Sequence, residues 1–207
     1  ELNAKISSIN ESKKKVVISN NDQKIESDAL IMSIGVSPNL DSKIIDNTKI
    51  ILDKSGYIET NDNYETNTNN LFAIGDIIGG PWLAHKAMHD AINCVEYISS
   101  GKNTHKPKNH HIPGCIYSLP QVATIGYTEQ QLDELSIPFK KGNFPFLANG
   151  KSQTMSNIFG FVKTLFNSET GEFLGAHLIG PDVTEMISTF GLAISSESTE
   201  DEFINTV

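Results

Sequence analysis

The sequence predicts an α/β protein whose last hundred residues form a separate α+β part. Three observations carry this prediction. The short apolar run 71–74 leads through Gly-Asp into a long amphipathic segment, which is typical of a buried strand followed by a helix. The polar stretch 101–111 is a linker by composition and indicates a domain boundary. Beyond it, short strand-like runs and helix-like segments follow one another, as in α+β folds.

Composition excludes several classes of protein. The 207 residues, 38% of them hydrophobic and 20% charged, suffice for a packed protein of one large or two modest domains. A net charge of −9 argues against a nucleic-acid partner, which would require basic stripes. No apolar run approaches the roughly 20 residues of a membrane helix, so we expect no membrane association. Cys94 and Cys115 form no CxxC pair, and we expect two thiols rather than a redox centre.

The first hundred residues contain several predicted strands and one long helix. Residues 13–19 and 23–27 flank polar turn residues and predict a hairpin. The nearly continuous apolar run 28–35 predicts a strand covered on both faces. Residues 49–60 are typical of a strand, an Asp-x-x-Gly turn and a second strand. Apolar residues then recur at helical spacing from position 83 until Gly101 ends the helix, and Pro81 suits its start.

The last hundred residues predict a sheet with helices. Five strands are expected, at 115–117, 121–125, 139–144, 161–166 and 173–179. Thr128 is expected to cap a short helix and Thr199 the last one. A longer helix is expected from about Asp182 to Ser196, where Glu185 favours the helix start electrostatically.

Asp76 is the candidate functional residue. With Gly75 it ends the apolar run 71–74, and ligands bind at the carboxyl ends of strands in open α/β sheets. An ionised carboxylate there accepts hydrogen bonds from hydroxyl groups, such as those of a ribityl or ribose chain. The N-terminus of the following helix would favour an anion or a ring that gains negative charge. From composition alone, Asp76 equally fits a simple turn cap.

Several motifs resemble a known family. "LFAIGDIIGGPWLAHKA", residues 71–87, resembles the second flavin-binding motif of dihydrolipoyl dehydrogenases, which are flavoprotein disulfide reductases. "ALIMSIGVSPNL" resembles the segment that closes the NAD domain of that family. "PQVATIGYTEQQL", "FPFLANGKSQT", "GFVKTLF" and "LGAHLIGPDVTEMI" resemble its dimerisation domain, in order and spacing. The resemblance covers essentially the whole chain.

The resemblance implies a cofactor site. Asp76 would bind a ribityl hydroxyl of FAD, and the start of the helix would approach the flavin mainly through backbone N–H groups. The helix-start residues concerned are Trp82, Leu83, Ala84 and His85. Trp82 stands where the family leads us to expect Met, which should change the local packing. Gly35 matches a glycine that lies beside NAD in the family.

The resemblance also implies a domain order and missing parts. We expect the end of a nucleotide-binding FAD/NAD(P) domain followed by an α+β dimerisation domain. Residues 1–74 would end the NAD-binding domain, residues 75–111 would form the FAD-binding segment and linker, and residues 112–207 would form a truncated dimerisation domain. The redox CxxxxC pair would precede Glu1, and the catalytic His and Glu would follow Val207. We therefore expect a C-terminal fragment with no catalytic residue of its own.

The implied function is oxidation of protein-bound dihydrolipoyl groups, with reduction of NAD through FAD and a redox disulfide. The partners would be a second copy of the chain and the lipoyl domains of 2-oxo acid dehydrogenase complexes or of the glycine cleavage system. The compartment would be a bacterial cytoplasm or a mitochondrial matrix. Two alternatives stay open: another flavin disulfide reductase, such as mercuric or glutathione reductase, or a non-catalytic FAD-binding and dimerisation module. The "LAHKA" helix start favours dihydrolipoyl dehydrogenase.

The remaining histidines predict structural roles. His110 and His111 lie near Cys115, but their spacing lacks a second ligand pair, so we expect no metal site. His177 lies within a predicted strand, where a hydrogen-bonded structural histidine is expected.

Overall fold

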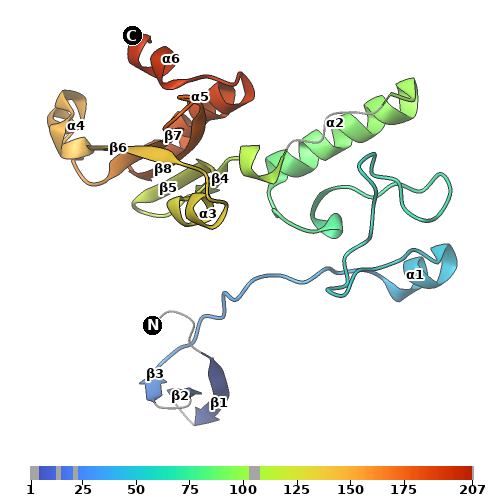
Figure 1. Ribbon diagram of the computed structural model, residues 1–207. Helices are drawn as coiled ribbons and strands as arrows, with labels where there is room; N and C mark the ends of the chain where they lie inside the picture. Colours follow the sequence, from blue (N-terminus) through green and yellow to red (C-terminus); the bar gives the residue numbers. More distant parts are fainter. Residues whose placement is uncertain (1–4, 13–14, 21–22, 103–107, 207) are drawn as a thin grey trace. The chain divides into compact units, whose positions relative to one another are not determined.

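The computed structural model describes residues 5–12, 15–20, 23–102 and 108–206 (Figure 1). The chain divides into two compact units, Glu1–Ser37 and Pro38–Val207. Each unit is described by itself below.

A three-stranded antiparallel sheet forms the first unit. Its strands are β1 (Ile6–Ser12), β2 (Lys15–Asn20) and β3 (Lys24–Ser27), in the order β1-β2-β3. The pairing of β2 with β3 confirms the predicted hairpin, and Ile18 lies opposite Ile25. The Asn20 N–H donates to the Gln23 carbonyl at 3.0 Å, which closes the turn. Of the predicted hairpin and turn, Lys13, Lys14, Asn21 and Asp22 lie outside the described residues.

The predicted strand at 28–35 is wrong for this chain. These residues form no regular element, and Ile31 and Ile34 are 89% and 82% exposed. A strand covered on both faces requires neighbouring strands and a layer on each side. Within the described part of the chain, no strand pairs with this segment. The apolar pattern is present, but the partners that would bury it are not.

The second unit begins with irregular segments around a small core. Its elements up to residue 100 are α1 (Ser42–Thr48), the 3₁₀ helix η1 (Gly75–Ile78) and α2 (Ala84–Ser100). Ile50, Ile58 and Ala73 form the buried centre of that core. The strands predicted in 49–60 shrink to a single bridge between Leu52 and Ile58, and the run 71–74 forms only the bridge from Phe72 to Glu65. The strands predicted in 49–60 and at 71–74 are absent for the same reason as the strand predicted at 28–35. Within the described residues, no further strands pair with these segments and extend the single bridges.

The long helix α2 confirms the predicted helix. Gly101 ends it in the left-handed conformation (φ 66°), and its N–H donates to the Tyr97 carbonyl at 2.8 Å. Of the apolar residues that recur at helical spacing, Met88, Ile92 and Val95 are exposed. The buried positions are instead Lys86, Asp90 and Cys94, because the preceding loop packs against that side of the helix. Pro81 lies two residues before the N-cap Leu83 rather than in the first turn.

A five-stranded antiparallel sheet forms the rest of the second unit. The strand order is β4-β5-β8-β7-β6. The strands are β4 (Gly114–Ile116), β5 (Gln121–Gly126), β6 (Phe139–Pro145), β7 (Phe161–Asn167) and β8 (Phe173–Gly180). Each end of the five predicted strands lies within one residue of the observed one, so that part of the prediction is confirmed.

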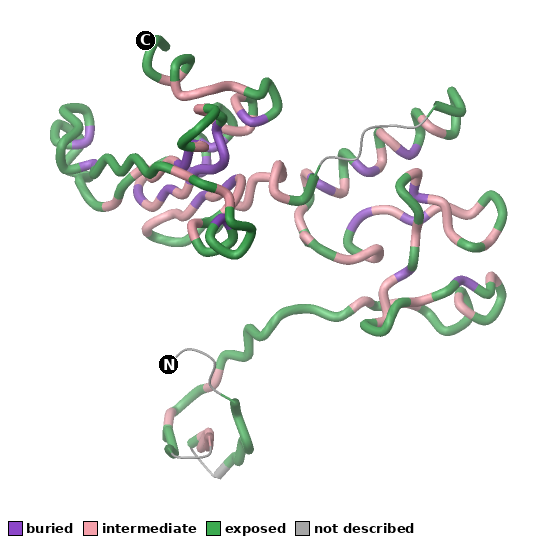
Figure 2. Tube along the Cα trace, in the orientation of Figure 1, coloured by how far each residue is buried: buried purple, intermediate pink, exposed green. Residues whose placement is uncertain are grey.

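Short helices surround this sheet. They are η2 (Asn109–His111), α3 (Glu129–Glu134), η3 (Phe146–Ala148), α4 (Gly150–Thr154), α5 (Val183–Ser195) and α6 (Glu200–Asn205). Helix α5 packs on β5 and β8, where the buried residues concentrate (Figure 2). The predicted caps are confirmed, because Thr128 and Thr199 each form a capping box with the residue three positions later. Helix α4 and the two short 3₁₀ helices η2 and η3 were not predicted.

Candidate functional site

The candidate site begins at the turn that carries Asp76. Gly75 and Asp76 start η1, and the N-cap Ile74 separates them from the buried Ala73. Gly75 has a φ of +75°, a conformation that glycine adopts readily, and it is buried. The Asp76 side chain is exposed, and no hydrogen bond or ion pair joins it to any described residue. An exposed carboxylate without a partner has its full capacity to accept hydrogen bonds from a ligand.

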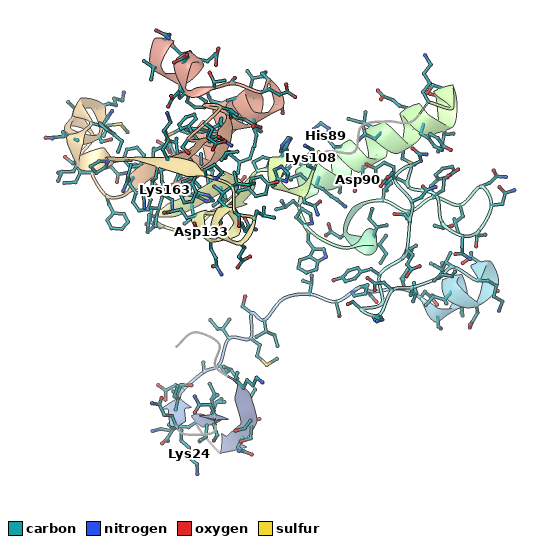
Figure 3. All side chains as sticks on the ribbon, in the orientation of Figure 1. Lys24, His89, Asp90, Lys108, Asp133 and Lys163 are labelled. Carbon is teal, nitrogen blue, oxygen red and sulfur yellow. The ribbon has the colours of Figure 1, made fainter. Side chains whose placement is uncertain are left out.

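A buried network holds this turn against α2. The Lys86 ammonium and the Asp90 carboxylate form an ion pair of 2.7 Å and expose 5% and 2% of their side chains. The Gly75 N–H donates to Asp90 Oδ2 at 3.1 Å, and Lys86 Nζ donates to the Gly75 carbonyl at 3.4 Å. Figure 3 shows Asp90 on the side of α2 that faces the preceding loop.

Tyr64 completes the network from the loop before the turn. Its hydroxyl donates to Asp90 Oδ1 at 3.0 Å, and its side chain is fully buried. Burial, together with the neighbouring Asp90 carboxylate, raises the pKa of Tyr64 to about 12. The tyrosine is therefore a neutral donor at physiological pH. Both carboxylate oxygens of Asp90 are thus hydrogen-bonded inside the protein.

The N-terminus of α2 offers free backbone donors. The N-cap residue Leu83 has no side chain that can accept a hydrogen bond from the first turn. Among the described residues, the backbone N–H groups of Ala84, His85 and Lys86 find no acceptor. Such N–H groups carry the positive end of the helix dipole. Trp82, just before the helix, is 47% exposed and stacks on Tyr57 with ring centroids 6.1 Å apart.

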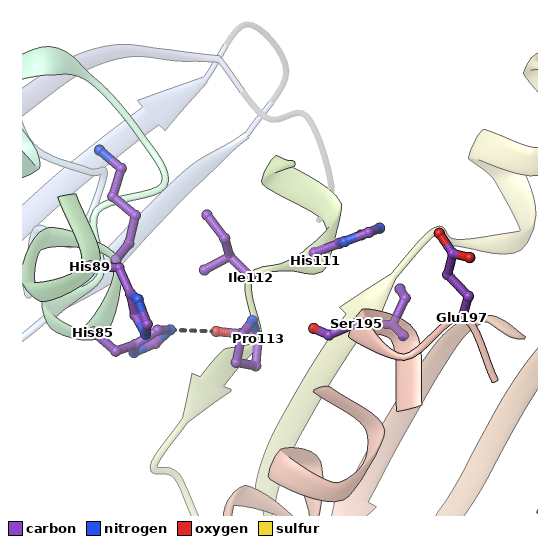
Figure 4. Close-up of a pocket in the computed structure, with 9 residues that line it drawn as sticks. His85, His89, His111, Ile112, Pro113, Ser195 and Glu197 are labelled. Atoms are coloured by element: carbon purple, nitrogen blue, oxygen red, sulfur yellow. Dashed lines mark hydrogen bonds between the residues drawn. The ribbon is translucent and has the colours of Figure 1, made fainter. Parts of the chain in front are cut away.

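His85 is half-buried and lines a cavity. Its Nε2 donates to the Pro113 carbonyl at 2.8 Å (Figure 4). The cavity has a volume of about 530 Å³. It is lined by His85, Lys86, His89, His111, Ile112, Pro113, Ile194, Ser195 and Glu197. Of the six predicted site residues, only His85 lines it.

None of the other predicted positions lines this cavity. Gly35 belongs to the first unit, where its φ is +105° and its surroundings are open. His177 Nε2 donates to the Tyr127 carbonyl at 2.9 Å, which confirms a structural role. Burial lowers the pKa values of His110 and His111. In the described ranges, no three His, Cys, Asp or Glu side chains gather as metal ligands would.

The buried network of Tyr64, Lys86 and Asp90 around Gly75 is not predicted from the sequence. Lys86 and Asp90 are opposite charges four residues apart on a helix, which usually indicates an exposed pair. The helix sequence itself gives little indication that this pair is buried, because the burial depends on the preceding loop that packs against it. Tyr64, which lies 26 residues before Asp90 in the sequence, gave no signal.

Comparison with known proteins decides the family. Residues 1–91 match the pyridine nucleotide-disulphide oxidoreductases, and residues 112–207 match the dimerisation domain of the same family. The chain belongs to the pyridine nucleotide-disulphide oxidoreductases. Members of this family use FAD and a nicotinamide nucleotide. The fold class predicted from the sequence, a nucleotide-binding segment followed by an α+β dimerisation domain, is thereby confirmed.

Several curated relatives of this oxidoreductase chain are named dihydrolipoyl dehydrogenase, and relatives from Glycine max and Vigna unguiculata are named leghemoglobin reductase. The enzyme of Rhizobium etli is 39% identical over 185 residues, which cover 89% of the chain and 38% of that protein. The enzyme of Zymomonas mobilis is 41% identical over 177 residues, which cover 86% of the chain and 38% of that protein. The chain therefore spans well under half of the length of these relatives.

Solved structures of flavoprotein disulfide reductases share the fold. The HOCl-induced reductase RclA of Escherichia coli superposes with a TM-score of 0.89 at 20% identity, over 99% of this chain and 47% of that one. LpdA of Mycobacterium tuberculosis gives a TM-score of 0.86 at 22% identity, over 99% and 45% of the two chains. No helix within the described ranges of this oxidoreductase chain has the length and apolar character needed to span a membrane.

The donors and acceptors around Asp76 fit the cofactor of this family. A ribityl chain presents hydroxyl donors, and the exposed Asp76 carboxylate is an acceptor without a partner. A flavin ring gains negative charge when it is reduced, and the free N–H groups at the start of α2 favour such charge. The residues present therefore match both ends of the flavin-ribityl unit in chemical type.

Proposed function

We propose that this chain is the flavin-binding and dimerisation part of a dihydrolipoyl dehydrogenase. Such an enzyme oxidises dihydrolipoyl groups on lipoyl domains and reduces NAD. The lipoyl domains would belong to 2-oxo acid dehydrogenase complexes or to the glycine cleavage system. The names of the relatives at 39% and 41% identity support this proposal over mercuric or glutathione reductase.

The observation that carries the proposal is the unpartnered Asp76 carboxylate beside a helix N-terminus with free donors. FAD, when bound, would carry electrons between a redox disulfide and NAD. Asp76 would hold a ribityl hydroxyl by a charge-assisted hydrogen bond. The backbone N–H groups of Ala84 and His85 would orient the ring, with Trp82 and Leu83 beside them. Gly35 would lie beside NAD, where a residue without a side chain permits close approach.

The domain limits and the setting belong to the same proposal. Residues 1–74 would close the NAD-binding domain, and residues 75–111 would form the FAD-binding segment and the linker to the next domain. Residues 112–207 would pair two copies of the chain as a homodimer. The match of 112–207 to a dimerisation domain supports the last assignment. Relatives occur in bacteria and in mitochondria, which supports a bacterial cytoplasm or a mitochondrial matrix as the compartment.

Substitution of Asp76 tests the proposal. In the FAD-loaded protein, Asp76→Ala removes a charge-assisted hydrogen bond and should weaken FAD binding by about tenfold. Asp76→Asn keeps one acceptor oxygen and should lose less. Bound flavin is measured by visible absorbance after gel filtration, and the dissociation constant by fluorescence titration.

The matched control for this experiment is Asp62→Ala. It removes another exposed carboxylate from the same unit and should leave FAD binding unchanged. Unchanged flavin occupancy in Asp76→Ala would refute the assigned role of Asp76.

We further propose that the 207-residue chain alone is inactive. Its two cysteines lie on different elements, Cys94 buried in α2 and Cys115 in β4, and both are free thiols. They therefore cannot act as the redox pair that the reaction requires. Purified chain mixed with FAD, NAD and dihydrolipoamide should form no NADH above the enzyme-free rate, as followed by absorbance. Turnover that depends on the chain would overturn this proposal.

A further inference from the structure

We propose that the buried pair Lys86–Asp90 is a positioning element for the flavin site. It fixes the backbone of Gly75, and thereby the direction of the Asp76 carboxylate, relative to the first turn of α2. This inference rests on the proposed role of Asp76 as the ribityl acceptor, and it adds the residues that hold this acceptor in place.

The two charges hold both polar backbone groups of Gly75. Asp90 Oδ2 accepts the Gly75 N–H at 3.1 Å, and the Lys86 ammonium reaches the Gly75 carbonyl at 3.4 Å. The same two side chains contact each other at 2.7 Å. The peptide groups on both sides of the Gly75 Cα are thus attached to one turn of α2. Because Gly75 directly precedes Asp76, the backbone from which the Asp76 side chain extends is held against α2.

Close packing of the turn on the helix supports this attachment. A Cβ atom on Gly75 would lie 3.2 Å from the Cβ atom of Ala87, which is tighter than an ordinary contact. Ala87 lies on α2 between Lys86 and Asp90, so packing and hydrogen bonding act on the same stretch of helix. Ala87 is small enough to allow the backbone of the turn to approach the helix axis closely.

Stability alone does not explain a buried ion pair at this place. Burial of two charges carries a desolvation penalty, and apolar residues of similar volume often replace such pairs without loss of stability. Apolar residues, however, would leave the N–H and carbonyl groups of buried Gly75 without partners. The pair is therefore best understood as the means by which α2 satisfies and orients the turn.

The Lys86–Asp90 pair also leaves the charge of the Asp76 carboxylate, the proposed ligand-binding group, unaltered. Lys86 and Asp90 neutralise each other, and the Tyr64 hydroxyl occupies the second oxygen of Asp90. Among Asp, Glu, Lys and Arg side chains in residues 71–90, Asp76 is the one without a partner among the described residues. The network can thus orient Asp76 without competing for its oxygens.

Two double variants of equal charge separate positioning from stability. Lys86→Met/Asp90→Asn removes both charges but retains an oxygen that accepts the Gly75 N–H. Lys86→Met/Asp90→Leu removes both charges and the acceptor. Neither leaves a lone buried charge, so both should fold. The Leu variant should have the lower melting temperature, because the Gly75 N–H and the Tyr64 hydroxyl lose their acceptor, and FAD affinity is therefore compared per folded protein. If the Leu variant does not fold, Lys86→Met/Asp90→Ala lacks the acceptor without added bulk and takes its place.

Two measurements read the effect of these variants. In the 207-residue chain, hydrogen exchange of the Gly75 amide is followed by NMR and should be faster by about tenfold or more with Leu than with Asn. In the FAD-loaded protein, the Leu variant should bind FAD about tenfold more weakly than the unsubstituted protein. The Asn variant should recover most of that affinity and the flavin absorption spectrum.

The outcomes distinguish this inference from the proposed function. If the Leu variant keeps normal FAD affinity and normal Gly75 exchange, the positioning role is wrong. If its melting temperature falls while FAD affinity per folded protein stays normal, the pair is only structural and the inference is also wrong. If Asp76→Ala leaves FAD binding unchanged, the proposed function fails, and the exchange measurement still tests whether the pair holds Gly75.

Discussion

Trp82 illustrates how a side chain can depart from a family pattern at a site that uses backbone groups. Met was expected at this position, and the indole instead stacks on Tyr57 at 6.1 Å and 28°. Trp82 therefore packs against the irregular segment around Gly56, before α2 begins. The N–H groups that we assign to the flavin follow it in the chain, at Ala84 and His85. The substitution thus changes packing and leaves the proposed backbone donors in place.

Glu129 carries the clearest pH-dependent contribution to stability. At the first position of α3, it accepts hydrogen bonds from Lys141 of β6 at 2.8 Å and from Lys163 of β7 at 2.7 Å. These two lysines lower the pKa of Glu129 to about 2, from an ordinary value of 4.5. Its folded-state pKa lies below the unfolded one, so its contribution is complete above about pH 4.5 and is lost as the pH falls towards 2.

Glu129→Gln should remove this acid-dependent contribution. The variant should be less stable than the unsubstituted chain at pH 6, and the difference should shrink as the pH falls through this window. Urea unfolding at several pH values between about 6 and 2 measures this difference, because that range covers both pKa values of Glu129. Glu134→Gln, on the same helix but without a lysine contact, should show no such narrowing. A constant difference between Glu129→Gln and the unsubstituted chain across this range would contradict the assignment.

At the scale of secondary structure, elements defined by local signals could be predicted from the sequence. The strands β4 to β8 alternate or run apolar between clear turns and were located to within one residue. The caps at Thr128 and Thr199 are local motifs of four residues, and both formed as expected. The end of α2 at Gly101 follows from the conformational freedom of a single residue.

Elements that need distant partners could not be predicted in this way. The runs 28–35 and 71–74 carry strand patterns, yet a strand exists only when another strand pairs with it. The buried face of α2 could not be predicted for a related reason. Met88 and Ile92 recur at helical spacing but are exposed, whereas the contacts of the preceding loop decide that Lys86 and Asp90 are buried.

The candidate site likewise has one part that the sequence predicts and another part that it does not. The chemical character of Asp76 as an acceptor followed from its residue type and its place before a helix. The groups that hold it, Tyr64 and Lys86 among them, act through tertiary contacts over 11 to 26 residues of sequence. No local pattern encodes such contacts, so they became visible only in three dimensions.

At the scale of the whole molecule, exposed apolar side chains support pairing of two copies. Leu119 and Tyr117, in the segment between β4 and β5, are 99% and 79% exposed. Leu119 and Phe159 line a cavity of about 350 Å³ within the residues that match a dimerisation domain. Single exposed apolar residues are ordinary, but a group of large ones indicates a surface that a partner covers.

Leu119→Glu should weaken self-association of the protein by about tenfold or more, because a buried charge without a partner is costly at an interface. Light scattering or sedimentation over a concentration series measures the dissociation constant. Leu135→Glu, a similar substitution of a side chain that is 56% exposed after α3, is the matched control and should have little effect. An unchanged dissociation constant for Leu119→Glu would count against this surface as the homodimer interface.

The extended segment 28–37 has a consequence for how this chain behaves during synthesis and storage. Ile31, Met32, Ile34 and Val36 are more than half exposed, and their backbone N–H and carbonyl groups are open to pairing. A β-prone stretch of this kind can pair with the same stretch of another molecule. The solubility of the chain therefore depends on whether a neighbouring strand reaches residues 28–37 before another copy of the same segment does.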